Sequence, residues 1–331
     1  MTAGSPHKAG ANDYLDDRTL NFLIGSGAGS GTDRVARLFA DHLSRLLPET
    51  TVAPVNNSRA GGRVVASQLW DAEPDGLTIG ILQSHLYYWT LQNLETPGFE
   101  LQNYSFLGSM TRSNRVLVAS HASGIRSMAD IYDAGRPVIV AANTTLSSHY
   151  LEALLINTLL GTRLLPVPGF SGGARNMAVI TGEADCQIGS LEAVQPIIDA
   201  GAGSIVLVVT GDSIPPLTPA PARLEQEAAG APNEWIVPVI NGAAASGRLI
   251  AAPPGVEADR LAILRDLFNS VMANPEFVDE AASVGMVVNA SSGDQVQRRL
   301  ASVFNNGADM SANLQRALQC GEHLAETGTA C

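Results

Sequence analysis

Lysine is almost absent from this 331-residue chain. Lys8 is the only one, so nearly all of the positive charge is arginine. Chemistry that depends on a lysine amine, such as Schiff-base formation, therefore has almost no candidate residue. Long apolar runs are missing too, because the longest, around residues 204–210, are strand-sized and far shorter than the roughly 20 residues that a bilayer requires. The sequence predicts a water-soluble protein.

Cysteine is scarce, and its three copies are too scattered for the paired ligand spacing of a zinc site. We therefore expect no metal, and no cofactor is expected either. Cys320 and Cys331 enclose a short tail, which predicts a disulfide in an oxidising compartment and otherwise two free thiols in a frayed tail. Cys186 lies in a strand-like run and is expected to be buried.

Basic residues are outnumbered by acidic ones, 20 against 32, which gives a formal charge of −12. This balance argues against broad contact with nucleic acid or with anionic membranes, since both need a basic surface. It still allows a small anionic ligand, because backbone N–H groups bind anions locally whatever the net charge. We expect a small-molecule ligand and no nucleic-acid partner.

What the sequence does contain is a repeated order of strand, loop and helix. Residues 19–24 are strand-like, residues 33–47 have apolar residues at helical spacing, and residues 51–55 are strand-like again. Further strands are expected at residues 77–82, 115–120, 137–141, 163–167, 185–189, 204–210 and 248–252, helices at 261–271 and 295–304, and an irregular segment at 215–238. The pattern predicts an α/β protein of mostly parallel sheets with flanking helices, split into two lobes.

The strongest local signal is the loop Gly25-Ser-Gly-Ala-Gly-Ser-Gly31, between a strand and a helix. Glycines let the backbone approach a ligand, and the free N–H groups of a first helical turn bind anions. Thr32 or Asp33 is expected to cap the helix. A dinucleotide-binding pattern fails because Ser30 stands at its last glycine position, and a phosphate loop would need a lysine. An anion site and a glycine-rich turn without a ligand both stay open.

Two further loops have the same strand-to-helix context. Gly169-Phe-Ser171-Gly-Gly173 satisfies the Gly-x-Ser-x-Gly pattern, so a serine hydrolase is the alternative function, although His323 in the tail is the only downstream histidine for its triad. In Asn143-Thr-Thr-Leu-Ser-Ser-His149 the two serines serve either as caps or as ligand donors, and the histidine is expected to be packed within the loop. His42, on a helix between charged residues, is expected to be solvated.

At these loops the sequence resembles the substrate-binding proteins of tripartite tricarboxylate transporters, the TctC or Bug receptors. Their first glycine-rich loop ends in Gly-Thr-Asp, as residues 31–33 do here. Residues 55–62, Val-Asn-Asn-Ser-Arg-Ala-Gly-Gly, are similar to their Val-Glu-Asn-Arg-Pro-Gly-Ala-Gly-Gly stretch, and residues 74–78, Pro-Asp-Gly-Leu-Thr, to their Pro-Asp-Gly-Tyr-Thr turn. Residues 147–149 match their Ser-Ser-His segment, residues 167–185 run in register with their Val-Pro-Tyr-Lys-Gly loop and the helix and strand after it, and residues 253–255 resemble Ala-Pro-Ala-Gly. The likeness covers about residues 18–304.

The resemblance implies a type II periplasmic-binding fold whose two lobes hinge over a carboxylate. Residues 1–17 would be a leader or linker, residues 18–116 and 247–331 lobe 1, and residues 117–246 lobe 2. The protein would be a monomeric periplasmic receptor without enzymatic activity. It would deliver a di- or tricarboxylate, aromatic acids included, to the integral membrane subunits of a tripartite tricarboxylate transporter or to a sensor. The residues expected to bind the ligand are Ser26, Gly27, Ala28, Gly29, Ser30, Gly31, Thr32, Asp33, Ser84, His85, Thr145, Ser147, Ser148, His149, Gly169, Phe170, Ser171, Gly189 and Ser190.

The chain also departs from the family it resembles. Residues 25–28, Gly-Ser-Gly-Ala, replace the usual Pro-Phe-Ala-Pro, which predicts a roomier pocket. Gly189 stands where many members have an aspartate that would bind an ammonium group, so an amino-acid ligand is not expected. The aromatic run at residues 85–89 either lines the enlarged space or packs under the lobe.

Overall fold

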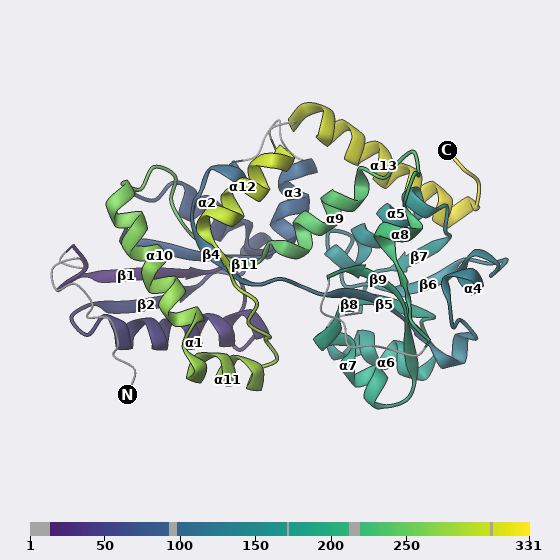
Figure 1. Cartoon of the computed structure of the whole chain (residues 1–331), viewed down its shortest axis with the longest axis horizontal. Coiled ribbons are helices and arrows are strands. Elements are labelled where there is room, and N and C mark those ends of the chain that lie inside the picture. Colours follow the sequence, from purple (N-terminus) through teal and green to yellow (C-terminus); the bar gives the residue numbers. More distant parts are fainter. Residues whose placement is uncertain (1–13, 93–97, 171, 212–218, 305–306) are drawn as a thin grey trace. The chain divides into compact units, whose positions relative to one another are not determined.

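A computed structural model describes residues 14–92, 98–170, 172–211, 219–304 and 307–331 (Figure 1). The chain divides into two compact units. Unit 1 comprises residues 1–83, 98–111 and 248–298, and unit 2 comprises residues 84–97, 112–247 and 299–331. Within the described ranges, no helix combines the length and the apolar character needed to span a membrane.

Unit 1 is built on a six-stranded sheet in the order β12-β4-β11-β3-β1-β2. Strand β1 pairs in parallel with β2 and β3, whereas β11 runs antiparallel to β3. The strands are β1 (Thr19–Ile24), β2 (Thr51–Asn56), β3 (Thr78–Leu82), β4 (Ser105–Thr111), β11 (Gly247–Ala252) and β12 (Ser291–Ser292). The helices of this part are α1 (Gly31–Leu46), η1 (Arg59–Gly62), α2 (Arg63–Trp70), η2 (Leu101–Asn103), α10 (Ala258–Met272), α11 (Pro275–Ser283) and the first part of α12 (Gly293–Phe304).

The core of unit 1 lies where α1, α10 and α11 meet β1. Phe39 of α1 is fully buried, with its ring 5.7 Å from Phe22 and 6.0 Å from Phe268. Burying each such ring stabilises the fold by roughly 1.5–3 kcal/mol. His42, predicted to be solvated, is instead buried in this core, with its ring 5.4 Å from Phe277 and its Nε2 3.0 Å from Glu280 Oε2. The prediction was wrong because it treated α1 alone, without α11 packed over it.

Unit 2 is built on a second six-stranded sheet in the order β10-β9-β5-β8-β6-β7. Strand β6 runs parallel to β7 and β8, and β5 runs antiparallel to β8 and β9. The strands are β5 (Arg115–Ser120), β6 (Val138–Ala141), β7 (Leu164–Val167), β8 (Cys186–Ser190), β9 (Gly203–Thr210) and β10 (Ala222–Arg223). The helices are α3 (His85–Gln92), η3 (His121–Ser123), α4 (Met128–Tyr132), α5 (Ser148–Leu160), α6 (Gly173–Thr181), α7 (Leu191–Asp199), α8 (Leu224–Glu227), α9 (Ile236–Ala245) and α13 (Gly307–Thr327). Two sheets with parallel strands and flanking helices confirm the predicted α/β fold, and Cys186 is buried as predicted.

The C-terminal residues do not lie where the resemblance placed them. Residues 299–331 belong to unit 2, because α13 packs along α5 on one face of the sheet, opposite α6 and α7 (Figure 1). Asn157 Nδ2 donates to the Gly321 carbonyl oxygen at 3.0 Å, and a Cβ at Gly321 would overlap the Leu154 carbonyl. A disulfide joins Cys320 and Cys331. The tail is therefore an ordered part of unit 2.

Candidate functional site

In unit 1, the glycine-rich loop leads into helix α1, whose N-terminus is capped. Ser30, not the predicted Thr32 or Asp33, caps α1, because helical geometry begins directly after it and its Oγ accepts from Asp33 N at 3.2 Å. The N–H groups of Gly31 and Thr32 lack an intrahelical acceptor, as first-turn amides do. A Cβ at Gly27, Gly29 or Gly31 would meet nothing within 4 Å, so this side of the loop is bare backbone. The loop offers free amide donors to an anion.

Asp33 holds this loop in place. It is 2% exposed, its Oδ2 accepts from Gly29 N at 2.7 Å, and its Oδ1 accepts from Asn56 Nδ2 at 2.8 Å and from Arg37 Nε at 3.0 Å. Burial opposes ionisation, but the hydrogen bonds from Asn56, Gly29 and Arg37 outweigh it, so the pKa of Asp33 is lowered. Asn56 also donates to the Ser26 carbonyl at 3.0 Å. Asp33 therefore fixes the backbone that leads into the free amides of Gly31 and Thr32.

In unit 2, three predicted loops meet at one edge of the sheet. Strands β6, β7 and β8 are parallel and lead directly into α5, α6 and α7, so the N-termini of these helices lie at the same edge. Ser147 precedes α5, but its Oγ donates to the Thr144 carbonyl at 2.7 Å and does not cap the helix, which leaves the first amides of α5 available. Ser190 caps α7, and Gly169 N donates to the Asn143 carbonyl at 2.9 Å, joining two of the loops.

The other predicted residues of this edge differ in their surroundings. Thr145 is exposed, and Phe170 packs against the core cluster of β5, α6 and α7. The missing Cβ of Gly189 would lie 2.9 Å from Val194 Cγ1, so close packing against α7 favours glycine there. Ser171 lies outside the described residues, and His85 is the first residue of α3.

A cavity of about 30 Å³ in unit 2 joins two predicted residues, Ser84 and Ser148, to a buried ion pair that the sequence analysis missed. Arg115 is 7% exposed and Glu152 is fully buried, and Arg115 Nε donates to Glu152 Oε2 at 2.7 Å. The Nη2 atom of Arg115 lies 2.5 Å from the same oxygen, off the direction of a hydrogen bond. The available signal was a single charge in each of two apolar runs, at the start of β5 and within α5. The remaining wall consists of Ser113, Ala243, Ala244 and Gly247.

His149, the second residue of α5, is held uncharged beside this pair. Burial and the positive charges of Arg115 and Arg175 lower its pKa well below the usual 6.5. Its Nδ1 is buried and has no hydrogen-bond partner in the part of the chain that the structure describes. The packing of His149 agrees with the expectation that it is held within the loop.

The folded protein is expected to lose stability as the pH falls below about 6.5, and His149 contributes to this loss. The unfolded chain protonates this histidine and the folded one does not, so the slope is up to about 1.4 kcal/mol per pH unit. The contribution of neutral His149 to the free energy of unfolding is complete above pH 6.5 and decreases as the pH falls. Urea unfolding of wild type and His149→Gln at several pH values between 7.5 and 5 measures it, with exposed His323→Gln as the control. Identical slopes in all three proteins would contradict the prediction.

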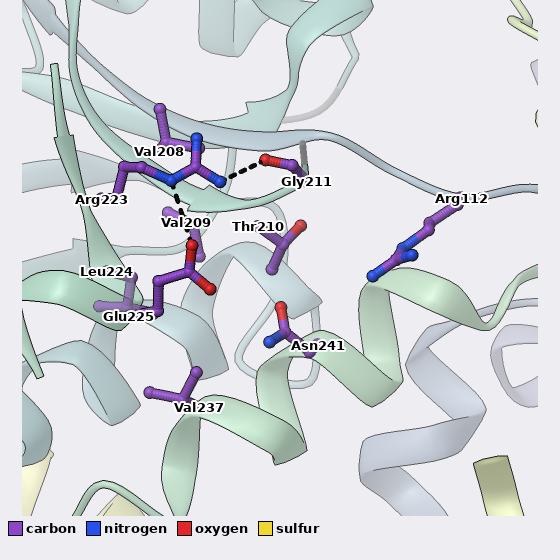
Figure 2. A pocket seen from close by; sticks show the side chains of 10 residues that line it. All are labelled: Arg112, Val208, Val209, Thr210, Gly211, Arg223, Leu224, Glu225, Val237 and Asn241. Carbon is purple, nitrogen blue, oxygen red and sulfur yellow. Dashed lines mark hydrogen bonds and ion pairs between the residues drawn. The ribbon is translucent and has the colours of Figure 1, made fainter. Parts of the chain in front are cut away.

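A second cavity of unit 2, of about 50 Å³, lies between the end of β9 and α9 (Figure 2). Of the two arginines in its lining, Arg223 is already paired, because its Nε lies 3.1 Å from Glu225 Oε1 and its Nη2 donates to the Gly211 carbonyl at 2.9 Å. Figure 2 shows Arg112 and Asn241 away from that pair. The Arg223–Glu225 pair therefore leaves Arg112 as the second cationic residue of this lining.

Two alternatives from the sequence can now be compared with the structure. Nothing favours the hydrolase: His323 is exposed on α13 and its Nε2 lies 3.0 Å from Thr329 Oγ1, while Ser171 is outside the described residues. Of the aromatic run, Tyr87 and Tyr88 are fully buried. These two side chains pack inside unit 2, which agrees with the interpretation that the run packs under a lobe and does not line the pocket.

Comparison with known proteins gives one family and one fold. The profile of the tripartite tricarboxylate transporter family receptors, TctC, matches residues 35–310. A TctC solute-binding protein from Polaromonas is 14% identical, with a TM-score of 0.71 over 91% of this chain and 98% of that one. A Rhodopseudomonas palustris protein solved with adipate is 18% identical, with a TM-score of 0.65 over 92% and 97%. MatC of the same organism, solved with malate, is 18% identical, with a TM-score of 0.63 over 91% and 99%.

Proposed function

The chain belongs to the tripartite tricarboxylate transporter receptor family, and from this premise we propose that it binds a small di- or tricarboxylate in the periplasm. The observation that carries the proposal is the edge of unit 2, where uncapped amides of α5, Ser148 and buried guanidinium groups lie together. Helix N-termini and arginines both favour carboxylate oxygens. The structural neighbours that contain adipate and malate are consistent with such a ligand.

The glycine-rich loop of unit 1 is proposed as a second set of carboxylate contacts. Its free amides at Gly31 and Thr32 need no rearrangement to bind an anion, because Asp33 and Asn56 already fix the loop. Donors that are fixed in advance reduce the ordering cost of binding. The contributions of the two units can be tested separately by variants in each.

We further propose that the protein, once it has bound its ligand, delivers that ligand to the integral membrane subunits of such a transporter and catalyses no reaction. The family is one of receptors, and the disulfide between Cys320 and Cys331 suits an oxidising compartment such as the periplasm. A monomer is the proposed state in solution. An esterase assay with activated esters is expected to show no turnover that Ser171→Ala removes.

A thermal-shift screen with succinate, malate, adipate and citrate tests the proposal directly. A ligand at 100 times its Kd stabilises the native state by about 2.7 kcal/mol, which raises Tm by several degrees. The diamide of adipate is the matched control, since it has the same length and carries no charge. The proposal fails if no di- or tricarboxylate raises Tm, or if the diamide does so equally well.

A further inference from the structure

Arg175, at the edge of unit 2, has buried donors whose hydrogen bonding is incomplete among the described residues. It is the third residue of α6, at the edge where the parallel strands end. Its Nε and Nη1 are buried and donate to no acceptor among the residues that the structure describes. Burial and the charge of Arg115 lower its pKa to about 10. Buried guanidinium donors without acceptors are costly, so native proteins rarely keep them without a function.

The neighbouring charges leave Arg175 without a counter-ion. Glu152 is the acidic partner in this cluster, and Arg115 engages it at 2.7 Å. His149 is neutral, and its Nδ1 is buried without a partner as well. Two guanidinium charges against one carboxylate give the cluster a formal charge of +1. What the cluster lacks is one negative charge and hydrogen-bond acceptors for Arg175, and a carboxylate group supplies both.

We propose that Arg175 binds one carboxylate group of the ligand through its buried guanidinium, with the Arg115–Glu152 pair positioning it. The inference rests on the proposed function and deepens it, because it names the residue that recognises an anionic end group. A planar guanidinium meets the two oxygens of a carboxylate through parallel hydrogen bonds, which an ammonium group cannot do. The amides of α5 at the same edge remain for another acidic group, so the edge favours a dicarboxylate over the corresponding monocarboxylate.

Adipate and its monomethyl ester test the charge requirement, with calorimetry on the full chain. Wild type is expected to bind adipate roughly 10- to 100-fold more tightly than the ester, the range for hydrogen bonds to a charged group. Arg175→Gln is expected to bind adipate weakly and to distinguish the two compounds less than about 3-fold. Arg175→Lys is expected to recover only part of the preference, and exposed Arg316→Gln to keep all of it. Unchanged discrimination in Arg175→Gln overturns the proposal.

A second measurement needs no organic ligand. Without added anions, Arg175→Gln is expected to unfold at the same urea concentration as wild type or a higher one, because it removes an unpaired buried charge. Sodium sulfate is expected to stabilise wild type and Arg316→Gln more than Arg175→Gln. A purely structural arginine would give the reverse, a destabilised Arg175→Gln with the full sulfate response, and that result overturns the proposal.

The two measurements separate this inference from the proposed function. If no carboxylate stabilises wild type but Arg175→Gln loses the sulfate response, the carboxylate receptor is wrong and the anion site at Arg175 stands. If adipate binds wild type and Arg175→Gln with equal affinity, the receptor stands and the role of Arg175 is wrong.

Discussion

Glu152→Gln is expected to lower the free energy of unfolding by about 3–5 kcal/mol, the range for removing one partner of a buried ion pair. Glutamine keeps the size of the side chain but not its charge. Arg115, 7% exposed and now 2.7 Å from a neutral group, would lie beside Arg175 with no negative charge nearby. Urea unfolding at pH 7.5 measures the loss.

Two controls distinguish a lost ion pair from a general effect of substitution in unit 2. Exposed Glu183→Gln removes the same charge from the same unit and is expected to change stability by less than about 0.5 kcal/mol. The double variant Arg115→Met, Glu152→Leu removes both charges and is expected to recover most of the stability, because buried pairs can be replaced by apolar residues at little cost. A loss below about 1 kcal/mol in Glu152→Gln would show that the pair acts like an exposed one.

The elements that the sequence predicted best are those fixed by local pattern. The strands β1 and β5 have the predicted bounds, because each is a short apolar run between turn residues. Residues 215–238 are predicted to be irregular, but α8 lies within this segment and α9 begins in it at Ile236, because prolines and alanines hide the apolar positions. The helix α13 was missed because its face is buried by α5, more than 150 residues earlier in the chain, and local patterning does not report so distant a partner.

The candidate site shows the same difference between features set by local sequence and features set by distant contacts. Its loops could be predicted, because glycines and small hydroxyl residues before a helix are local signals. The cluster of Arg115, Glu152 and Arg175 could not, because its members come from a strand and two different helices. Only the order of the sheet, with β5 antiparallel to β8, brings the first residue of β5 to the edge where the helices begin.

Gly62→Ala is expected to distort the glycine-rich loop and to weaken both stability and ligand binding. Gly62 has a φ of +88°, and a Cβ there would lie 2.7 Å from the Gly25 carbonyl oxygen. Gly25 begins the loop, and the same oxygen accepts from Gln83 Nε2 at 3.2 Å, so relieving the overlap moves backbone on both sides. The left-handed conformation alone costs an alanine about 1–2 kcal/mol, and the overlap brings the expected loss to about 3 kcal/mol or more.

Gly255→Ala is the matched control, because Gly255 lies in the same unit with a φ of +85° and open space around its Cβ position. It is expected to lose only the conformational part, about 1–2 kcal/mol, and to keep the adipate affinity of wild type. Urea unfolding and calorimetry on both variants give the comparison. Equal losses of stability in the two variants would mean that position 62 needs glycine only for its positive φ angle. A larger loss at Gly62 together with weaker adipate binding would mean that the contact between Gly62 and Gly25 sets the position of the amides at the start of α1.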